Sequence, residues 1–374
     1  LVRLKHHLKQ FVQDQIKSRH EEIEDIEVLR FMEMGIVLSR IRKDEKRLIA
    51  EAGIRGAKVT PINNTLEVFD VTTARYTGLD VVLERCVDHH RAVYMLTVFE
   101  HWGIPTVNRQ SVVEIYGNRL LTSLSLKKHG VPMPEVRLAY TPDSALEAME
   151  ALGYPVVLRP VEGPENQLVS LIKDQYAAET ILEHKRILGT YHHSIFFIQK
   201  YIEMTGHDIR AYVVGEETVA AVSVLTHHWV GSITDGGQMV NEPVTEDLSA
   251  LAVSAVRAIG GGVAVVDMVR TKDAWHVHEI GPPSSLCEAS DVTGINIPGK
   301  IIRGMIQPPF LTMASDDYAT EIKAAVTPPE NNSRYHVLLN NGQRVWALRT
   351  ELSVASKEIE AIRQIRNDYN YAFL

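Results

Sequence analysis

The chain has 374 residues, of which 45% are hydrophobic and 23% are charged. This length predicts roughly two to three structural units, and this composition excludes a disordered or collagen-like chain. The net charge of −8 gives no general attraction to nucleic acid or anionic lipid, so neither is expected as a partner. The longest apolar runs, such as residues 154–158 and 263–266, are far shorter than the ~20 residues of a membrane-spanning helix.

The chain contains two cysteines, Cys86 and Cys287. They are too few for a disulfide framework or a four-cysteine zinc site, and they fit a reducing compartment. The first residues also lack the apolar run and the cleavage site of a secretory signal. We therefore expect a cytoplasmic protein.

Residues 1–33 carry the first recognisable pattern. Their apolar side chains recur on one stripe of a helix, which predicts an amphipathic helical arm. The stripe consists of Leu4, Leu8, Phe11, Val12 and Ile16. Such an arm packs either on its own domain or on a partner, and the sequence leaves both alternatives open.

Residues 34–110 alternate between short apolar runs and helical patterns. The expected strands are residues 35–38, 66–70, 80–83 and 104–108, and the expected helices are residues 44–52 and 91–102. Alternation of this kind predicts a parallel sheet that is covered by helices on both faces. We therefore assign residues 34–110 to an α/β domain.

Residues 111–310 follow a different pattern, in which neighbouring strands are close enough in sequence to form hairpins. The expected helices are residues 118–129, 144–152, 177–188 and 248–259, and the expected strands are residues 154–160, 168–172, 194–199, 210–214, 219–225, 263–269 and 275–280. Pro132 and Pro134 predict an extended linker. Gly260-Gly261-Gly262 follows a helix rather than opening one, which favours a tight turn over a phosphate loop.

Residues 311–374 form an extra tail. Asn340-Asn341-Gly342 is a favoured hairpin turn and lies between two strand-like runs. A short helix is expected at residues 359–366.

Several blocks of sequence follow one another in a fixed order between Gly35 and Met305. They are Glu84-Arg85-Cys86-Val87, residues 153–158, residues 182–185, Ile198-Gln199-Lys200-Tyr201-Ile202, Gly206-His207-Asp208-Ile209-Arg210, Gly260-Gly261-Gly262 with Asp267, and residues 293–300. Together they resemble the LysX group of the RimK-like ATP-grasp ligases. The segments 1–33 and 311–374 have no counterpart in this group.

The resemblance implies an ATP-grasp fold of the α/β plus α+β class. Residues 34–110 would form a flavodoxin-like N-terminal α/β domain. Residues 111–195 would form a central lobe and residues 196–310 a C-terminal lobe, and the two lobes would enclose a nucleotide cleft.

The resemblance also implies an activity. Such ligases use ATP and Mg²⁺ to activate a carboxylate as an acyl phosphate, which an amine then attacks. LysX-type members join an acidic amino acid, aminoadipate or glutamate, to the C-terminal glutamate of a small carrier protein, LysW. The implied partners are a small acidic LysW-like carrier and an acidic amino acid, and we also expect a homo-oligomer or a paralogue partner.

Four candidate residues follow from the nucleotide-binding motifs of the family. Arg119 and Arg159 correspond to two phosphate-contacting lysines, and arginine keeps their charge but not their shape. Gln199 and Tyr201 correspond to the adenine-binding hinge. For the arginines a surface ion pair remains an alternative, and Tyr201 could instead belong to the core.

Four further candidates follow from the next motifs. Asp208 and Arg210 match a motif of the nucleotide site, with a purely structural pair as the alternative. Asp267 and Glu279 match the carboxylates that hold Mg²⁺. A salt-bridged face of the sheet is the alternative for these two.

The chain departs from the family around the cleft. Its phosphate loop reads Gly163-Pro164-Glu165-Asn166-Gln167, in which the proline lacks an amide donor and the glutamate adds negative charge. Arginines of the family are replaced by Val224, Leu225 and Asp235, and Gly281 stands at the last position of the metal motif. Two functions therefore stay open: an active ligase, or a catalytically degenerate pseudo-ligase that keeps the fold for nucleotide sensing, carrier docking or assembly with an active paralogue.

Overall fold

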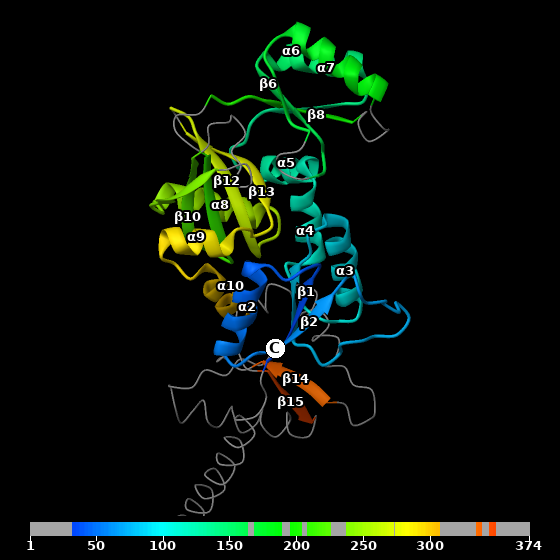
Figure 1. Cartoon of the computed structure of the whole chain (residues 1–374), viewed down its shortest axis with the longest axis vertical. Helices are drawn as coiled ribbons and strands as arrows, with labels where there is room; N and C mark the ends of the chain where they lie inside the picture. Colours follow the sequence, from blue (N-terminus) through cyan, green and yellow to red (C-terminus); the bar gives the residue numbers. More distant parts are fainter. Residues whose placement is uncertain are drawn as a thin grey trace, which may run out of the picture.

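The computed structural model describes most of the chain between residues 32 and 306 (Figure 1). The described residues are 32–163, 168–188, 195–203, 208–225, 237–272 and 274–306, together with 334–338 and 344–348. The predicted arm up to residue 31 and the predicted helix at residues 359–366 lie outside them. In the tail, β14 (Arg334–Leu338) and β15 (Arg344–Leu348) pair antiparallel around the predicted turn.

The N-terminal sheet is parallel, with the strand order β2-β1-β3-β4. Its strands are β1 (Glu33–Leu38), β2 (Lys58–Asn63), β3 (Val81–Arg85) and β4 (Thr106–Val107), and its helices are α2 (Lys43–Ile54), α3 (His89–His101) and α4 (Gln110–Gly117). Almost every residue of β1 and β3 is buried, as expected of central strands covered on both faces. The predicted parallel α/β arrangement is confirmed.

The strand predicted at residues 66–70 is wrong. This segment is a loop in which Leu66 and Val68 are 80% and 85% exposed. The strand is β2 instead, whose pattern is interrupted by Pro61. Because β2 lies at the edge of the sheet, it tolerates a residue that cannot donate a ladder hydrogen bond.

The central sheet is antiparallel, with the order β5-β8-β6-β7. Its strands are β5 (Val136–Ala139), β6 (Val156–Arg159), β7 (Ser170–Ile172) and β8 (Phe196–Lys200), and helices α6 (Pro142–Leu152) and α7 (Gln175–Leu188) pack against it. Residues 131–135, where a linker was expected, are in neither helix nor strand, and β5, which follows them, was not predicted. Since β8 pairs with β5 and β6, strand pairing favours a lobe boundary after Lys200 over one at residue 195, although the domain division itself stays a prediction.

The C-terminal sheet is also antiparallel, with the order β11-β10-β9-β12-β13. Its strands are β9 (Asp208–Val214), β10 (Glu217–Leu225), β11 (Gln238–Glu242), β12 (Val263–Arg270) and β13 (Trp275–Gly281). Helix α8 (Glu246–Ala258) packs on one face, and α9 (Leu286–Thr293) and α10 (Ile297–Ile306) pack on the other. Burial on both faces explains the long apolar runs of β9, β10 and β12.

Helix α5 (Arg119–Lys128) precedes the central sheet in sequence but packs with the C-terminal sheet. Its Leu126 belongs to the same buried cluster as Val256 of α8 and Val277 of β13. Figure 1 shows α5 between the two sheets. A side chain on α5 can therefore reach the cleft between them.

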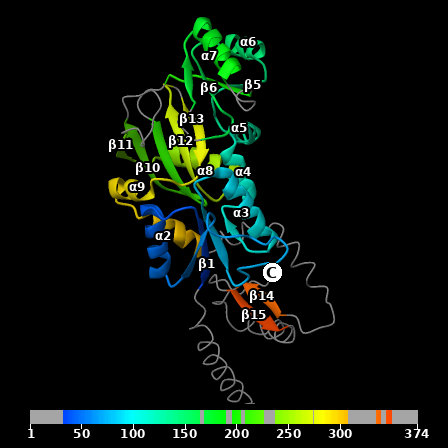
Figure 2. The same ribbon diagram turned by 45° about the vertical axis from the view of Figure 1, so that its right-hand side comes forward.

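The N-terminal domain is fixed to the C-terminal lobe by several polar contacts, including those of Asp44 and Asn108. The Asp44 carboxylate of α2 accepts the backbone N–H groups of Leu286 and Cys287, at 3.1 and 3.0 Å, and so caps α9. The Asn108 side chain pairs with both backbone groups of Val263 at 2.6 and 2.7 Å. Helix α2 lies beside α10 in both ribbon views (Figures 1 and 2).

The turn before β12 is built from glycines, as the sequence indicates. Gly260, Gly261 and Gly262 all have positive φ, between +83° and +106°. A Cβ atom on Gly262 would lie 2.2 Å from Asn108 Oδ1. Glycine at this position therefore permits the contact between the N-terminal domain and β12.

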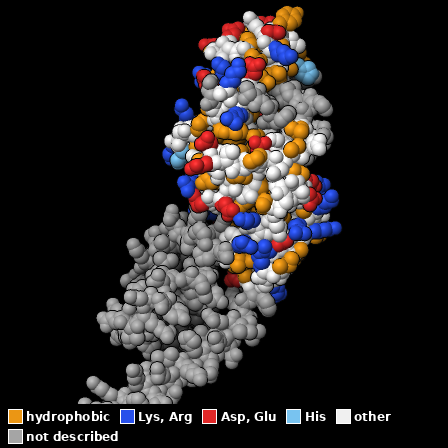
Figure 3. All heavy atoms as spheres, turned by 90° about the vertical axis from the view of Figure 1, so that its left-hand side faces the viewer, with side chains coloured by type: hydrophobic (Ala, Val, Ile, Leu, Met, Phe, Trp, Pro, Cys, Tyr) orange, Lys and Arg blue, Asp and Glu red, His pale blue; other side chains and the backbone are white. Residues whose placement is uncertain are grey.

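In the described part of the chain, none of the helices is both long and apolar enough to cross a membrane. On the face shown in Figure 3, basic and acidic side chains are interspersed.

Candidate functional site

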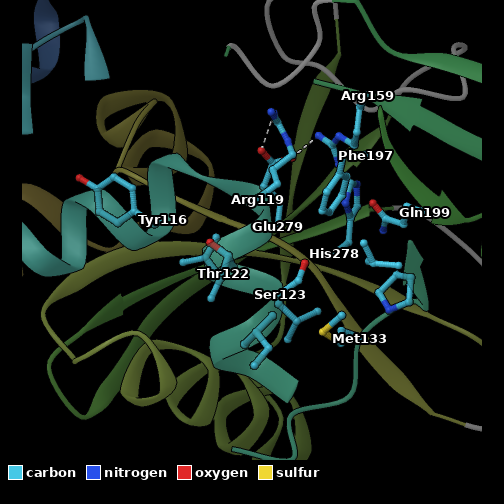
Figure 4. A pocket seen from close by; sticks show the side chains of 15 residues that line it. Tyr116, Arg119, Thr122, Ser123, Met133, Arg159, Phe197, Gln199, His278 and Glu279 are labelled. Carbon is cyan, nitrogen blue, oxygen red and sulfur yellow. Dashed lines mark hydrogen bonds and ion pairs between the residues drawn. The ribbon is translucent and has the colours of Figure 1, made fainter. Parts of the chain in front are cut away.

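A pocket lies where α5, β6, β8 and β13 meet (Figure 4). Its volume is about 20 Å³, and its walls are polar at one end and apolar at the other. Arg119, Arg159 and Glu279 form the polar end. Phe197 and Gln199 of β8 lie beside them. Four separate stretches of the chain therefore contribute to one small cleft between the central and the C-terminal sheet.

Arg119 and Arg159 meet on a single carboxylate. Arg119 Nη2 donates to Glu279 Oε1 at 2.9 Å, and Arg159 Nη2 donates to Glu279 Oε2 at 2.5 Å. The side chains are 9%, 4% and 15% exposed for Arg119, Arg159 and Glu279. The exposed surface ion pair that was an alternative for these arginines is therefore wrong, because all three groups are shielded from water.

Local structure positions Arg119 at the start of α5. The Asn118 side chain caps this helix by accepting the N–H groups of residues 120 and 121, both at 3.1 Å. Arg119 Nη1 donates to the Pro160 carbonyl at 3.1 Å, and Nη2 donates to the Gly163 carbonyl at 3.3 Å. The arginine thus holds the beginning of the predicted phosphate loop as well as Glu279.

Charge determines the ionisation of Glu279. Burial alone raises the pKa of its carboxyl group, but Arg159 and Arg119 outweigh this effect and bring the pKa below its ordinary value. The group is therefore a carboxylate at neutral pH. Two guanidinium groups share one negative charge at this end of the pocket.

A second ion pair lies beside the first on the C-terminal sheet. Arg210 of β9, Asp267 of β12 and Glu279 of β13 are register partners, so their side chains share one face. Arg210 binds Asp267 with two parallel hydrogen bonds, Nε to Oδ1 and Nη2 to Oδ2, both 2.8 Å long. Asp267 and Glu279 lie on neighbouring strands, as predicted, and the salt-bridged face that was an alternative for both carboxylates describes the arrangement.

In this arrangement the two predicted metal ligands are not open to a metal ion. Both predicted metal ligands already bind arginines, Asp267 through Arg210 and Glu279 through two others. Among the residues that the structure describes, no three His, Cys, Asp or Glu side chains gather closely enough to hold an ion. A divalent cation could use these carboxylates only after they leave their arginines.

The remaining candidates are placed less closely together. Gln199 is 8% exposed and lines the pocket, whereas Tyr201 follows β8 and is not part of the lining. Asp208 begins β9 opposite Val224 of β10. Val224 is 6% exposed, so the position that carries an arginine in the family belongs to the core here. Glu165 and Asp235 lie outside the described residues.

His278 stands at the first position of the metal motif but was not among the predicted site residues. A bulge in the pairing of β12 with β13 leaves it as the extra residue between Val277 and Glu279, and it lines the pocket next to Glu279. Its Nδ1 atom is buried and has no hydrogen-bond partner among the residues that the structure describes. A bulge re-aims a side chain without leaving a periodic signal in the sequence, so the sequence did not indicate that His278 faces the pocket.

Comparisons with known proteins agree with this architecture. Residues 34–115 match the family model of the LysX preATP-grasp domain, and residues 116–305 match that of the RimK-like ATP-grasp domain. Among solved structures, the RimK domain protein ATP-grasp from Sphaerobacter thermophilus is similar, with a TM-score of 0.63 and 22% identity over 73% of this chain and 98% of that one. The D-alanine–D-alanine ligase of Bacillus anthracis in complex with ATP has a TM-score of 0.57 and 16% identity, over 76% and 99% of the two chains. These two likenesses confirm the ATP-grasp fold.

Two curated relatives come from Sulfurisphaera tokodaii. Its glutamate–LysW ligase ArgX is 30% identical over 277 residues, which are 72% of this chain and 97% of the relative. Its alpha-aminoadipate–LysW ligase LysX is 29% identical over 277 residues, or 73% and 97%. Both carry the names of ligases, and the comparisons give no support to a catalytically degenerate relative. The chain therefore belongs to the RimK-like ATP-grasp family, with a LysX-type pre-ATP-grasp domain before its two lobes.

Proposed function

We propose that this protein is an ATP-dependent carboxylate–amine ligase that joins an acidic amino acid to the C-terminal glutamate of a LysW-like carrier protein. Membership of the family and the names of the two relatives support the reaction class and the partners. The observation that carries the proposal is the convergence of Arg119 and Arg159 on one anionic group. Phosphoryl transfer needs cations at this kind of position, because negative charge builds up on the transferring group.

The residues of the cleft would bind different parts of the nucleotide. The two guanidinium groups would bind phosphate oxygens, since the planar fork of arginine suits this geometry. Gln199 offers an amide donor and acceptor to the edge of an adenine ring, and Phe197 offers an apolar surface beside it. Tyr201 would approach the base from the segment that follows β8. Asp208 would keep a supporting place at the start of β9.

Magnesium has a defined place in this proposal. When bound, Mg²⁺ neutralises the phosphates, and Asp267 and Glu279 would hold it together with phosphate and water oxygens. Both carboxylates must first leave the arginines that they bind in the present structure. Asp267 would exchange its bond with Arg210, and Glu279 would release Arg119 and Arg159 to the phosphates.

The proposal is tested by incubating the full chain with MgATP, glutamate or aminoadipate, and a LysW-like carrier. We expect ADP release that requires both the amino acid and the carrier, and a carrier whose mass increases by one amino-acid residue. Arg159→Gln should lower turnover by about 10² to 10³, the usual cost of losing one charge-stabilising group. Arg137→Gln is a matched control, because Arg137 is 50% exposed and pairs only loosely, at 3.9 Å, with Glu135.

A negative result is equally informative. If the protein binds MgATP but forms no adduct with either amino acid on any LysW-like carrier, the ligase assignment is wrong. Nucleotide binding alone would then define the function.

A further inference from the structure

Glu279 occupies the place that the proposed function reserves for a phosphate group. Its two carboxylate oxygens each accept from a different arginine, Arg119 at 2.9 Å and Arg159 at 2.5 Å. A phosphoryl group presents its oxygens from one centre in the same manner, and paired hydrogen bonds from arginine are common to both anions. The glutamate is therefore a chemical substitute for the ligand.

The contact also joins parts of the fold that border the cleft on opposite sides. Arg159 ends β6 of the central sheet, whereas Glu279 lies on β13 of the C-terminal sheet and Arg119 begins α5. Separation of the two sheets would break the bond between Arg159 and Glu279. Entry of a nucleotide and rupture of this bond are thus coupled by geometry.

The space beside Glu279 is too small for a phosphate group. The pocket measures about 20 Å³, and a single water molecule already needs about 10 to 15 Å³ by this kind of measure. A phosphate group can bind both arginines only if the carboxylate moves away from them. Stability alone gives no reason for the arrangement, because buried ion pairs are often no more stabilising than apolar side chains of the same volume.

We propose that Glu279 is an internal competitor for the phosphate groups of the nucleotide and that it selects for ligands with more than one phosphate. This inference rests on the proposed nucleotide site. A monophosphate only replaces one anion by another and leaves the displaced glutamate without its arginines. A diphosphate or triphosphate brings more negative charge and more oxygen atoms to the arginines, so it displaces the glutamate more effectively.

The competition has a consequence for magnesium. A displaced Glu279 carboxylate remains near the phosphates and next to Asp267, its register partner, and these negative charges repel one another. A divalent cation removes the repulsion, so the wild-type protein should bind ADP weakly without Mg²⁺ and tightly with it. A variant without the carboxylate should need Mg²⁺ much less.

The test is calorimetric titration of ADP into the full chain, with EDTA or with Mg²⁺, for the wild type and for Glu279→Gln. Without Mg²⁺ we expect the variant to bind ADP about 10- to 100-fold more tightly than the wild type, the usual range for a competing charge-assisted hydrogen bond. With Mg²⁺ the wild type should bind ADP more tightly than the variant, because the wild type keeps a carboxylate for the cation. Inorganic phosphate should bind to the variant but not measurably to the wild type.

Two further variants control for charge and for folding. Glu162→Gln removes a carboxylate from the loop that follows β6, where Glu162 accepts from Asn118 at 2.8 Å and lies 3.2 Å from His90, and it should leave ADP binding unchanged. Glu279→Asp keeps the negative charge, so it protects the fold if the glutamine variant is unstable. Its shorter side chain cannot bridge both arginines, and it should also bind ADP more tightly in EDTA.

The outcomes separate this inference from the proposed function. If the wild type binds MgADP but neither Glu279 variant binds ADP more tightly in EDTA, the internal competitor is refuted and the nucleotide site stands. If Glu162→Gln tightens binding as much as Glu279→Gln does, general electrostatics explains the effect and the inference is also refuted. If no form of the protein binds ADP under either condition, the inference and the proposed function fall together.

Discussion

Glu45 lies at the centre of a buried charged contact between α2 and β3. Its side chain is 0% exposed. Oε1 accepts from Arg42 Nη2 at 2.8 Å and from Arg85 Nη2 at 2.9 Å, and Oε2 accepts from the Arg42 backbone N–H at 2.9 Å. Burial alone raises the pKa of the Glu45 carboxyl, but the hydrogen bonds from Arg42 and the charge of Arg85 outweigh it and lower the pKa to about 2.

The effect on stability follows from the difference in pKa between the folded and the unfolded chain. The ordinary value is 4.5, so at about 1.4 kcal/mol per unit the ionised carboxylate contributes about 3 kcal/mol to the free energy of unfolding. Because the folded pKa is the lower one, this contribution is complete above about pH 4.5 and is lost as the pH falls towards about 2. Glu45→Gln should therefore destabilise the protein by about 3 kcal/mol at pH 7 and by roughly half of that at pH 3.

Urea unfolding of both proteins, followed by tryptophan fluorescence and circular dichroism between pH 7 and pH 3, measures this difference. Glu135→Gln is the control, because Glu135 is 62% exposed and lies 3.9 Å from Arg137. It should change the free energy of unfolding by less than about 1 kcal/mol at every pH. A difference between Glu45→Gln and the wild type that stays constant from pH 7 to pH 3 would refute the linkage argument.

Three further substitutions test how the N-terminal domain is joined to the C-terminal lobe. Gly262→Ala should lower the free energy of unfolding by about 2 kcal/mol, because φ is +103° and the added methyl group meets Asn108. Gly53→Ala is the control: open space surrounds this position, so the free energy of unfolding should not fall. Asn108→Leu should cost about 3 kcal/mol in thermal unfolding, since it leaves both backbone groups of Val263 without their buried partner. Asp44→Ala should cost about 1 to 2 kcal/mol, and hydrogen exchange should become faster at the first two amides of α9; unchanged exchange there would show that Asp44 does not cap the helix.

The sequence predicts the helices and strands whose apolar residues recur with a strong period or whose boundaries are clear. The helices α3, α6 and α8 lie within a few residues of their expected positions, and the hairpins of β6 with β7, β9 with β10 and β12 with β13 pair as expected. Elements without such a signal were missed. Strand β5 follows two prolines, and α10 contains Pro298 and Gly299 and is buried around most of its circumference, so neither local propensity nor period revealed them.

The candidate site was predictable as a set of residues but not as a set of contacts. The family motifs bring Arg119, Arg159, Gln199 and Glu279 into one cleft, where the structure also places them. The partner of each arginine depends on packing between segments 120 and 160 residues apart, which no local pattern records. The sequence alone therefore indicated a carboxylate ready for Mg²⁺, whereas the structure has that carboxylate bound to the arginines.

A crystal structure of the full chain with bound ADP, obtained both with and without Mg²⁺, is the most direct test of the central claim that Arg119 and Arg159 form the phosphate site. We predict that phosphate oxygens lie between the two guanidinium groups and that Glu279 has turned away from both. Phosphates bound elsewhere, with both ion pairs of Glu279 intact, would contradict the account.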